Sequence, residues 1–133
     1  AFNRCRSLKT INIPPGIESI KRGMFFGCNR LIDITFSEGL QEIGLEAFSR
    51  CNSLVSVNLP STLKVIGEEA FEGCTRLNEV YMPDSIEIIR ARAFKICNLT
   101  NFRIPPSIGV DVPEELVKVE KMLVGDVAMG SYI

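Results

Sequence analysis

The segment AFSRCNSLVSVNLPSTLKVIGEEAF, residues 47–71, begins and ends with Ala-Phe and holds one complete unit of a repeat. Its phenylalanine recurs every 23 residues, at Phe2, Phe25, Phe48, Phe71 and Phe94. Its cysteine keeps the same interval, at Cys5, Cys28, Cys51, Cys74 and Cys97. Self-similarity with a period of about 20 to 29 residues is typical of solenoids built from stacked repeats. The sequence therefore predicts about five 23-residue repeats, the last of them incomplete.

The centre of the quoted segment predicts a short β-strand. Val57 and Leu59 are two residues apart, so their side chains share one face of the strand, and the residues between and before them face outward. In most repeats a proline follows and ends the strand, because proline lacks the N–H that a ladder needs. These prolines are Pro14, Pro60, Pro83 and Pro105, with Ser37 as the exception. The pattern predicts one parallel sheet that runs along the solenoid.

The rest of each repeat returns the chain to the start of the next strand. Apolar residues follow at threefold spacing, as at Leu63 and Ile66, and the return ends in a segment such as EEAFEGC, residues 68–74. We expect a turn of helix there, which places the fold in the α/β class. Because one repeat leaves its apolar faces open, neighbouring repeats must cover them, and stability belongs to the array.

The cysteines occupy equivalent points of every repeat, which predicts a column inside the solenoid. Cysteine serves there as a small, weakly polar hydrophobe. Identical side chains in a parallel stack point the same way, so disulfides between neighbours are disfavoured. Ligands in a straight row do not surround a tetrahedral ion, and the chain has no histidine, so we expect neither a metal nor a cofactor.

The composition limits the classes of partner that the chain is expected to bind. The 133 residues include 15 basic and 16 acidic side chains, with a net charge of -1. No basic block indicates nucleic acid or an anionic membrane surface, and no apolar run is long enough to insert into a bilayer. The composition therefore favours neither nucleic acid nor a membrane as a partner.

The pattern AFxxCxxLxxIxLPxxLxxIGxxAF, almost complete from Ala47 to Phe71, resembles the BspA-like, or treponemal-type, family of leucine-rich repeats. The resemblance covers residues 1–108, with departures at Met24, at Ser37 and in the shortened fifth repeat. It implies a gently curved right-handed solenoid from a cell-surface or secreted protein. It also implies a role in adhesion, with host, matrix or partner-cell proteins as ligands.

Residues 109–133 leave the pattern and are expected to form a C-terminal cap. Asp111 followed by Glu114 resembles a capping box, Pro113 suits a first helical turn, and apolar residues keep helical spacing before Gly125. We expect a helix at about 113–124. The opposite end of the array begins within a repeat, which suggests a longer array or end-to-end association with another copy.

The outward side chains of the strands and of the residues beside them form the candidate binding face. They are Lys9, Thr10, Asn12, Asp33, Thr35, Ser56, Asn58, Asn78, Glu79, Tyr81, Asn101 and Arg103. Tyr81 and Arg103 are expected on adjacent repeats, about 4.8 Å apart, and both residue types are enriched in interface hot spots. The alternative is a face that is only solvated.

Catalysis finds little support. Asp33 and Glu79 are expected about 10 Å apart, a separation that suits an inverting glycosidase, but an open sheet offers no pocket to raise a pKa. No histidine and no phosphate-binding loop is present. The sequence favours a non-enzymatic protein-binding module. The alternatives are a structural spacer without a ligand, or a repeat attached to a catalytic domain.

Overall fold

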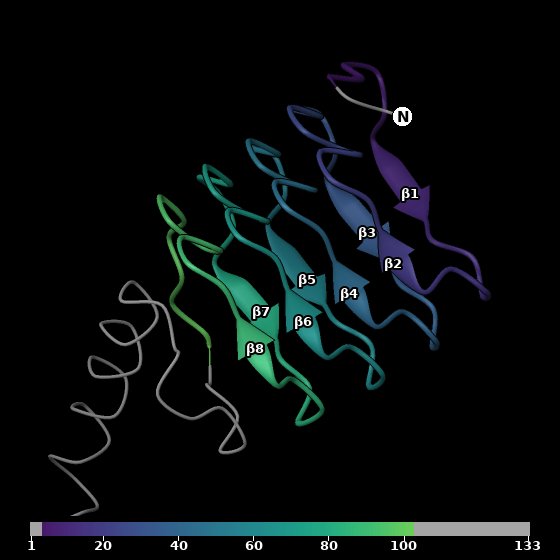
Figure 1. Cartoon of the computed structure of the whole chain (residues 1–133). Coiled ribbons are helices and arrows are strands. Elements are labelled where there is room, and N and C mark those ends of the chain that lie inside the picture. Colours follow the sequence, from purple (N-terminus) through teal and green to yellow (C-terminus); the bar gives the residue numbers. More distant parts are fainter. Residues whose placement is uncertain (1–3, 103–133) are drawn as a thin grey trace, which may run out of the picture.

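The structure, a computed structural model, describes residues 4–102 as a stack of coils with one repeat per coil (Figure 1). Each repeat contributes a strand of three residues and a strand of two residues. The strands are β1 (Thr10–Asn12), β2 (Ser19–Ile20), β3 (Asp33–Thr35), β4 (Glu42–Ile43), β5 (Ser56–Asn58), β6 (Val65–Ile66), β7 (Glu79–Tyr81) and β8 (Ile88–Ile89). The predicted parallel solenoid is confirmed.

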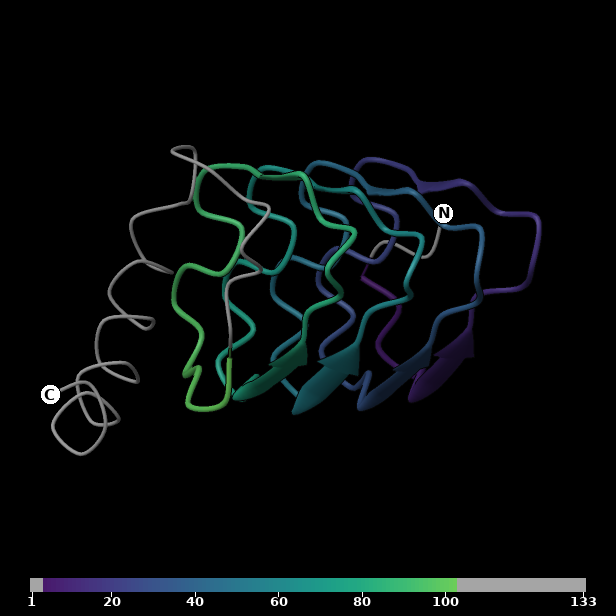
Figure 2. The same ribbon diagram turned by 90° about the horizontal axis from the view of Figure 1, so that it is seen from below.

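The three-residue strands form one side of the stack, called here the strand wall (Figure 2). β1 pairs with β3 and β5 pairs with β7, both parallel, and each register joins residues one repeat apart, as in Val57 opposite Val80. β3 and β5 are neighbours without a ladder between them. This interruption falls at the repeat in which Phe36-Ser37 replaces the Leu59-Pro60 type of sequence. The single continuous sheet predicted from the sequence is therefore wrong.

The two-residue strands form a second wall that the sequence interpretation missed. β2, β4, β6 and β8 build one four-stranded parallel sheet. Each strand ends in a buried isoleucine: Ile20, Ile43, Ile66 and Ile89. The repeats lie so close here that a Cβ on Gly67 would approach the Ile43 carbonyl oxygen to 2.7 Å. Glycine at Gly67 accommodates this close approach, whereas Arg90 holds the equivalent position next to β8.

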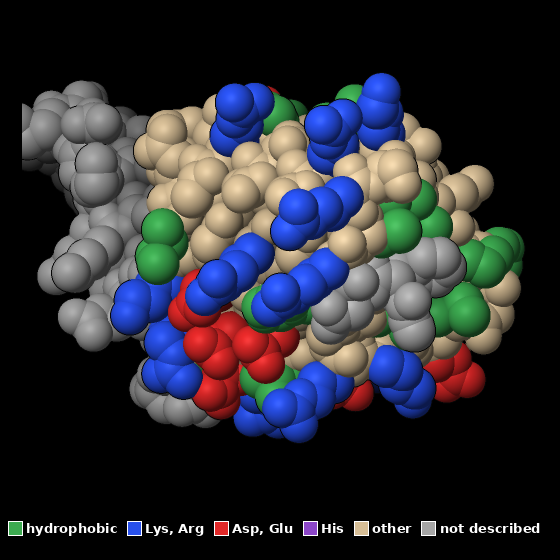
Figure 3. Space-filling view, turned by 90° about the horizontal axis from the view of Figure 1, so that it is seen from above, with side chains coloured by type: hydrophobic (Ala, Val, Ile, Leu, Met, Phe, Trp, Pro, Cys, Tyr) green, Lys and Arg blue, Asp and Glu red, His purple; other side chains and the backbone are tan. Residues whose placement is uncertain are grey.

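A run of six turn residues closes each repeat and occupies residues 22–27, 45–50, 68–73 and 91–96, along the upper edge of the stack in Figure 1. Figure 3 views the surface that these turns form, called here the turn wall. The described residues contain no helix, so the α/β class and the helical return segment are not supported. This part of the chain is a β-solenoid.

Hydrogen bonding explains why the turn run is not helical. The N–H groups of Ala47, Ser49 and Cys51 donate to carbonyls three residues earlier, each at 3.2 Å. The intervening N–H groups donate instead to the next repeat, for example from Phe48 to the Ala70 carbonyl at 2.8 Å. An α-helix directs every such N–H to the residue four positions earlier. Because every second N–H of the turn run donates to the next repeat, the turn run adds a third set of hydrogen bonds between repeats, beside those of the two strand walls.

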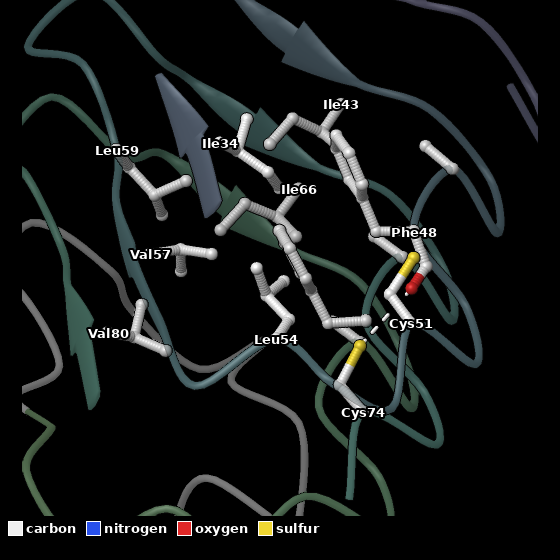
Figure 4. Close-up of a cluster of buried hydrophobic side chains, with 14 of the residues drawn as sticks. Ile34, Ile43, Phe48, Cys51, Leu54, Val57, Leu59, Ile66, Cys74 and Val80 are labelled. Carbon is white, nitrogen blue, oxygen red and sulfur yellow. Dashed lines mark hydrogen bonds between the residues drawn. The ribbon is translucent and has the colours of Figure 1, made fainter. Parts of the chain in front are cut away.

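The interior of the stack holds columns of equivalent side chains (Figure 4). Four phenylalanines stack nearly parallel, with centroids 5.1, 5.3 and 5.2 Å apart along the series Phe25, Phe48, Phe71 and Phe94. Leucine, isoleucine and valine columns from the two strand walls fill the remaining core. The columns predicted from the 23-residue period are confirmed.

Some predictions fall outside the described residues. The capping helix at about 113–124, the C-terminal cap at 109–133 and the position of Arg103 belong to this group. The curvature and hand of the solenoid remain predictions. Within residues 4–102, no helix has the length and apolar character that crossing a membrane requires.

The phenylalanine column should dominate stability. Phe48 is 0% exposed and stacks between Phe25 and Phe71. Phe48→Ala is expected to lower the free energy of unfolding by about 3–5 kcal/mol, because it removes a buried ring and leaves a cavity. Urea denaturation followed by circular dichroism measures the loss. Val55→Ala, at a position 45% exposed, is the control and should change it by less than about 0.5 kcal/mol. Equal losses for both variants would contradict this picture of the core.

Candidate functional site: the outer face of the strand wall

The strand wall presents its predicted residues to solvent because the strands alternate. In each strand the central residue, such as Val57 or Val80, faces the core, and its two neighbours face outward. Of the predicted residues that the structure describes, the exposed ones are Lys9, Thr10, Asn12, Asp33, Thr35, Asn58, Tyr81 and Asn101, and the half-buried ones are Ser56, Asn78 and Glu79. The binding role of these residues stays a prediction.

The register brings several of these side chains together. Thr10 lies opposite Asp33 and Asn12 opposite Thr35. Ser56 lies opposite Glu79 and Asn58 opposite Tyr81. A further parallel bridge joins Glu79 to Asn101. The face therefore carries rows of side chains that follow the solenoid axis, divided where no ladder joins β3 to β5.

The strongest polar cluster centres on Glu79. The Tyr81 hydroxyl donates to Glu79 Oε2 at 2.7 Å, and Asn101 Nδ2 donates to the same oxygen at 3.3 Å. The hydrogen bond to Glu79 and the charge of that carboxylate raise the pKa of the Tyr81 hydroxyl. These bonds hold an aromatic ring that is 52% exposed in one orientation. Because the Tyr81 side chain is already ordered before a partner binds, less conformational entropy is lost when it makes a contact.

A shallow hollow of about 300 Å³ adjoins this cluster. Its lining combines apolar groups with side-chain amides: Asn58, Leu59, Val80, Tyr81, Met82, Pro83, Asn101 and Phe102. An apolar floor with a few polar groups at its rim is the arrangement that receives an apolar side chain of a partner. Tyr81 thus lines a hollow that could receive an apolar side chain of a partner.

The sequence interpretation missed two apolar residues on this face. Ile32 is 53% exposed and Val55 is 45% exposed. They occupy the repeat position of Lys9 and Asn78, immediately before the strand residues, and so lie in the same row. Choosing only polar side chains from that row left them out, although the 23-residue register contained the information. An apolar centre with a polar surround is typical of protein interfaces.

The carboxylate pair considered for catalysis is not assembled. Asp33 lies on β3 and Glu79 on β7, with β5 between them and Ser56 directly opposite Glu79. Asp33 is exposed, and Glu79 is bound to Tyr81 and Asn101. This geometry provides no enclosed space in which two carboxyl groups could act on one bond.

The cysteine column has a structural role that includes weak hydrogen bonds. The Cys51 thiol donates to the Phe25 carbonyl at 3.2 Å, and Cys74 donates to Phe48 in the same way (Figure 4). The Phe25 carbonyl also accepts the Cys28 N–H within its own turn run. The thiols of Cys51, Cys74 and Cys97 therefore join their repeats to the ones before them, which the prediction of a simple packing residue did not include. The five cysteines are free thiols.

A family model and several solved structures relate the chain to known proteins. A family model for the BspA type leucine rich repeat region matches residues 1–111 in six copies. A leucine-rich repeat protein from Bacteroides ovatus is 36% identical with a TM-score of 0.71, and the match covers 74% of this chain and 25% of that one. A leucine rich cell surface protein from Faecalibacterium prausnitzii is 34% identical with a TM-score of 0.72, covering 84% and 31%. No curated protein sequence matches the chain.

A third solved structure matches almost the whole chain. The T. pallidum leucine rich repeat protein is 28% identical with a TM-score of 0.79, and the match covers 99% of this chain and 74% of that one. By contrast, the chain spans only about a quarter to a third of the length of the Bacteroides and Faecalibacterium relatives.

Burial makes the central thiols unreactive. Desolvation is the main cause that raises the pKa of Cys51 from its ordinary value of 9.0 to about 12. At pH 9 the folded protein should therefore hold roughly five-hundredfold less Cys51 thiolate than an unfolded chain, and only the thiolate attacks disulfide reagents. Timed labelling with a disulfide reagent, followed by mass spectrometry, measures the rate at each cysteine. Labelling of Cys51 in the native protein as fast as in urea would refute this.

The same shift predicts a pH dependence of stability. The folded thiol stays protonated to about pH 12, whereas the unfolded thiol ionises near pH 9.0. The stabilisation is complete below pH 9 and is lost as pH rises toward 12, by about 1.4 kcal/mol per pH unit for one thiol. Urea denaturation at pH 8 and pH 10 should show a larger decrease for the natural chain than for Cys51→Ala. Parallel decreases in the two proteins would assign the effect to other groups.

Proposed function

The chain belongs to the BspA-type leucine-rich repeat family, and from this premise we propose that it is a protein-interaction module that binds a protein partner through the outer face of its strand wall. The family match extends over residues 1–111, close to the span of 1–108 that the sequence suggested. Repeat proteins of this kind commonly use a broad, rigid face for recognition. The proposed activity is binding without catalysis.

The exposed ring of Tyr81, held by Glu79 next to a hollow, is the observation that carries the proposal. Aromatic anchors beside a pocket supply most of the binding energy in many interfaces. Ile32 and Val55 extend the apolar part of the face toward β3. Polar side chains, among them Asn12 and Asn58, surround it and can satisfy the hydrogen bonds of a partner.

A surface or secreted location is part of the proposal. One relative is described as a cell surface protein and another, 25% identical with a TM-score of 0.61, as a pneumococcal vaccine antigen. A host, matrix or partner-cell protein is then the class of ligand that the face would meet. Because the Bacteroides and Faecalibacterium relatives are three to four times longer than the matched region, this chain would act as one section of a longer array.

Substitutions on the face test the proposal. Tyr81→Ala combined with Val55→Ala should weaken binding to the preferred member of a panel of purified matrix and cell-surface proteins by about thirtyfold, the effect of losing one hot spot. Surface plasmon resonance against the immobilised panel measures the affinity. Both side chains are exposed, so the fold should persist, and circular dichroism verifies it.

A matched control lies on the second wall. Lys64→Ala combined with Glu87→Ala removes two exposed side chains without a net change of charge. This pair should leave the affinity within about twofold, because rim and distant contacts contribute little. Equal affinities for the face variant and the control would mean that the chain binds its partner through another surface. Absence of binding to any panel member by the natural chain would instead favour the spacer hypothesis.

A further inference from the structure

The turn wall carries a cluster of arginines around one aromatic ring. The guanidinium of Arg4 lies 5.7 Å from the centroid of Phe26, and that of Arg50 lies 5.8 Å from it. The three residues come from three successive repeats, and Phe26 is in the middle one. A cationic group at this distance from a ring is held by cation–π attraction. Arg4, Arg6, Phe26 and Arg50 are called here the arginine cluster.

An alternation of arginine and glycine in the repeats builds this cluster. Arg4, Gly27, Arg50 and Gly73 occupy equivalent positions in successive repeats. A Cβ on Gly27 would lie 3.1 Å from Cγ of Arg4, and a Cβ on Gly73 would lie 3.3 Å from Cγ of Arg50. Each glycine thus gives an arginine stem room to lie over the following repeat. The two guanidinium groups come from repeats about 10 Å apart along the axis.

Within residues 4–102, no ion pair neutralises the positive charge of the cluster. Among residues 4–102, the ion pairs join Arg92 to Glu68 at 2.7 Å and to Glu69 at 3.6 Å, and none includes an arginine of the cluster. Two acidic residues lie near the cluster. Glu46 lines a hollow together with Arg4 and Arg22. Glu72 precedes Gly73 in the chain, and burial and the charge of Glu69 raise its pKa. Figure 3 shows Lys and Arg side chains spread across this face, with the largest group of Asp and Glu side chains to one side.

Two shallow hollows meet at the cluster. One, of about 220 Å³, is lined by Arg4, Arg6, Phe26, Gly27, Asn29, Arg50 and Asn52. The other, of about 370 Å³, is lined by Arg4, Arg22, Gly23, Phe26 and Glu46. Guanidinium and amide groups predominate, and Phe26 is the single large apolar side chain in both. These hollows suit a polar ligand with separated negative charges.

The chemistry of the lining identifies the class of ligand. A guanidinium fork makes paired hydrogen bonds to the oxygens of an oxyanion. The side-chain amides of Asn29 and Asn52 can bind hydroxyl groups next to such an oxyanion. Phe26 is already engaged by two guanidinium groups, so no free aromatic platform is available to stack a nucleobase, as single-stranded nucleic acids require. The scarcity of apolar lining disfavours an acidic peptide.

We propose that the arginine cluster is a binding site for a sulfated polysaccharide that lies along the turn wall, with sulfate groups on Arg4 and Arg50 and sugar hydroxyls on Asn29 and Asn52. An extended polyanion suits guanidinium groups that recur along the axis on an open surface. The site is built from a different wall than the protein-binding face, so the two sites can be occupied independently. Since the net charge of the chain is -1, attraction depends on this local cluster and must be sensitive to salt.

Heparin is the probe for the test, with the full chain at roughly 0.1 M salt, where the Debye length is about 10 Å. Isothermal titration calorimetry should show that Arg4→Ala combined with Arg50→Ala weakens binding about tenfold or more, because two charge-assisted contacts are lost. Arg50→Lys should also weaken it, because lysine keeps the charge but lacks the planar fork. Arg90→Ala combined with Lys64→Ala removes two exposed charges elsewhere and is the matched control.

Two further ligands test which class of polyanion the arginine cluster binds. Hyaluronan, which carries carboxylates and no sulfate, has a lower density of negative charge than heparin. It should bind at least about tenfold more weakly, because fewer charge-assisted contacts to the cluster form at once. Single-stranded RNA tests the nucleic-acid alternative. Equal loss in the cluster variant and in the control would overturn the proposal, as would undiminished binding of hyaluronan or RNA. A thermal melt of every variant establishes that each is folded, and Arg50→Lys preserves the test if the double substitution destabilises the chain.

Discussion

The close stacking of backbone on backbone is the constraint on which the rest of the structure depends. Neighbouring repeats are joined by hydrogen bonds along the second wall and the turn wall, and along the strand wall except between β3 and β5. Successive repeats must therefore follow nearly the same path. Equivalent side chains then fall above one another, and the phenylalanine rings stack within 10° of parallel because their backbones are already aligned. The same closeness is seen at Gly44 and Gly67, where a Cβ would meet the backbone of the preceding repeat unless that backbone shifted. The 23-residue period of the sequence therefore follows from the close contact between the main chains of successive repeats.

The sequence predicts what depends on the period and misses what depends on competition between local and inter-repeat bonding. The columns and the outward strand residues follow directly from equal spacing, and both are found. A turn of helix was expected at EEAFEGC because apolar residues at threefold spacing precede it. Glu69 instead adopts a φ of 57°, and alternate N–H groups donate to carbonyls of the next repeat. Tertiary hydrogen bonds override the propensity of six residues. The second wall escaped notice because a two-residue strand places only one side chain, such as Ile43, in the core, and gives no alternation to detect.

The candidate site was predicted to a similar extent and for a similar reason. Register alone placed the polar strand residues, including Tyr81, on the outer face, whereas the bond from Tyr81 to Glu79 depends on side-chain rotamers that no spacing encodes. Ile32 and Val55 were missed because polarity, and not position, guided the choice. Within residues 4–102, buried side-chain nitrogen and oxygen atoms all have hydrogen-bond partners. The polar side-chain atoms of this interior are thus satisfied within the protein, and any recognition by this part of the chain belongs to the outward-facing residues.

Outward positions of a solenoid are not independent of the stack beneath them. Arg4 and Arg50 lie over Gly27 and Gly73, and these glycines also adopt left-handed backbone conformations, with φ of 73° and 78°. Arg50 itself has a φ of 64°, a conformation that costs a non-glycine residue of order 1 kcal/mol. Glycine would fit that turn with less strain, as it does one repeat earlier and one repeat later. Ile96 adopts a φ of 62° at the next equivalent position, so the fold tolerates side chains in this turn. What distinguishes Arg4 and Arg50 is the glycine that follows each of them one repeat later and leaves room for the arginine stem on the turn wall.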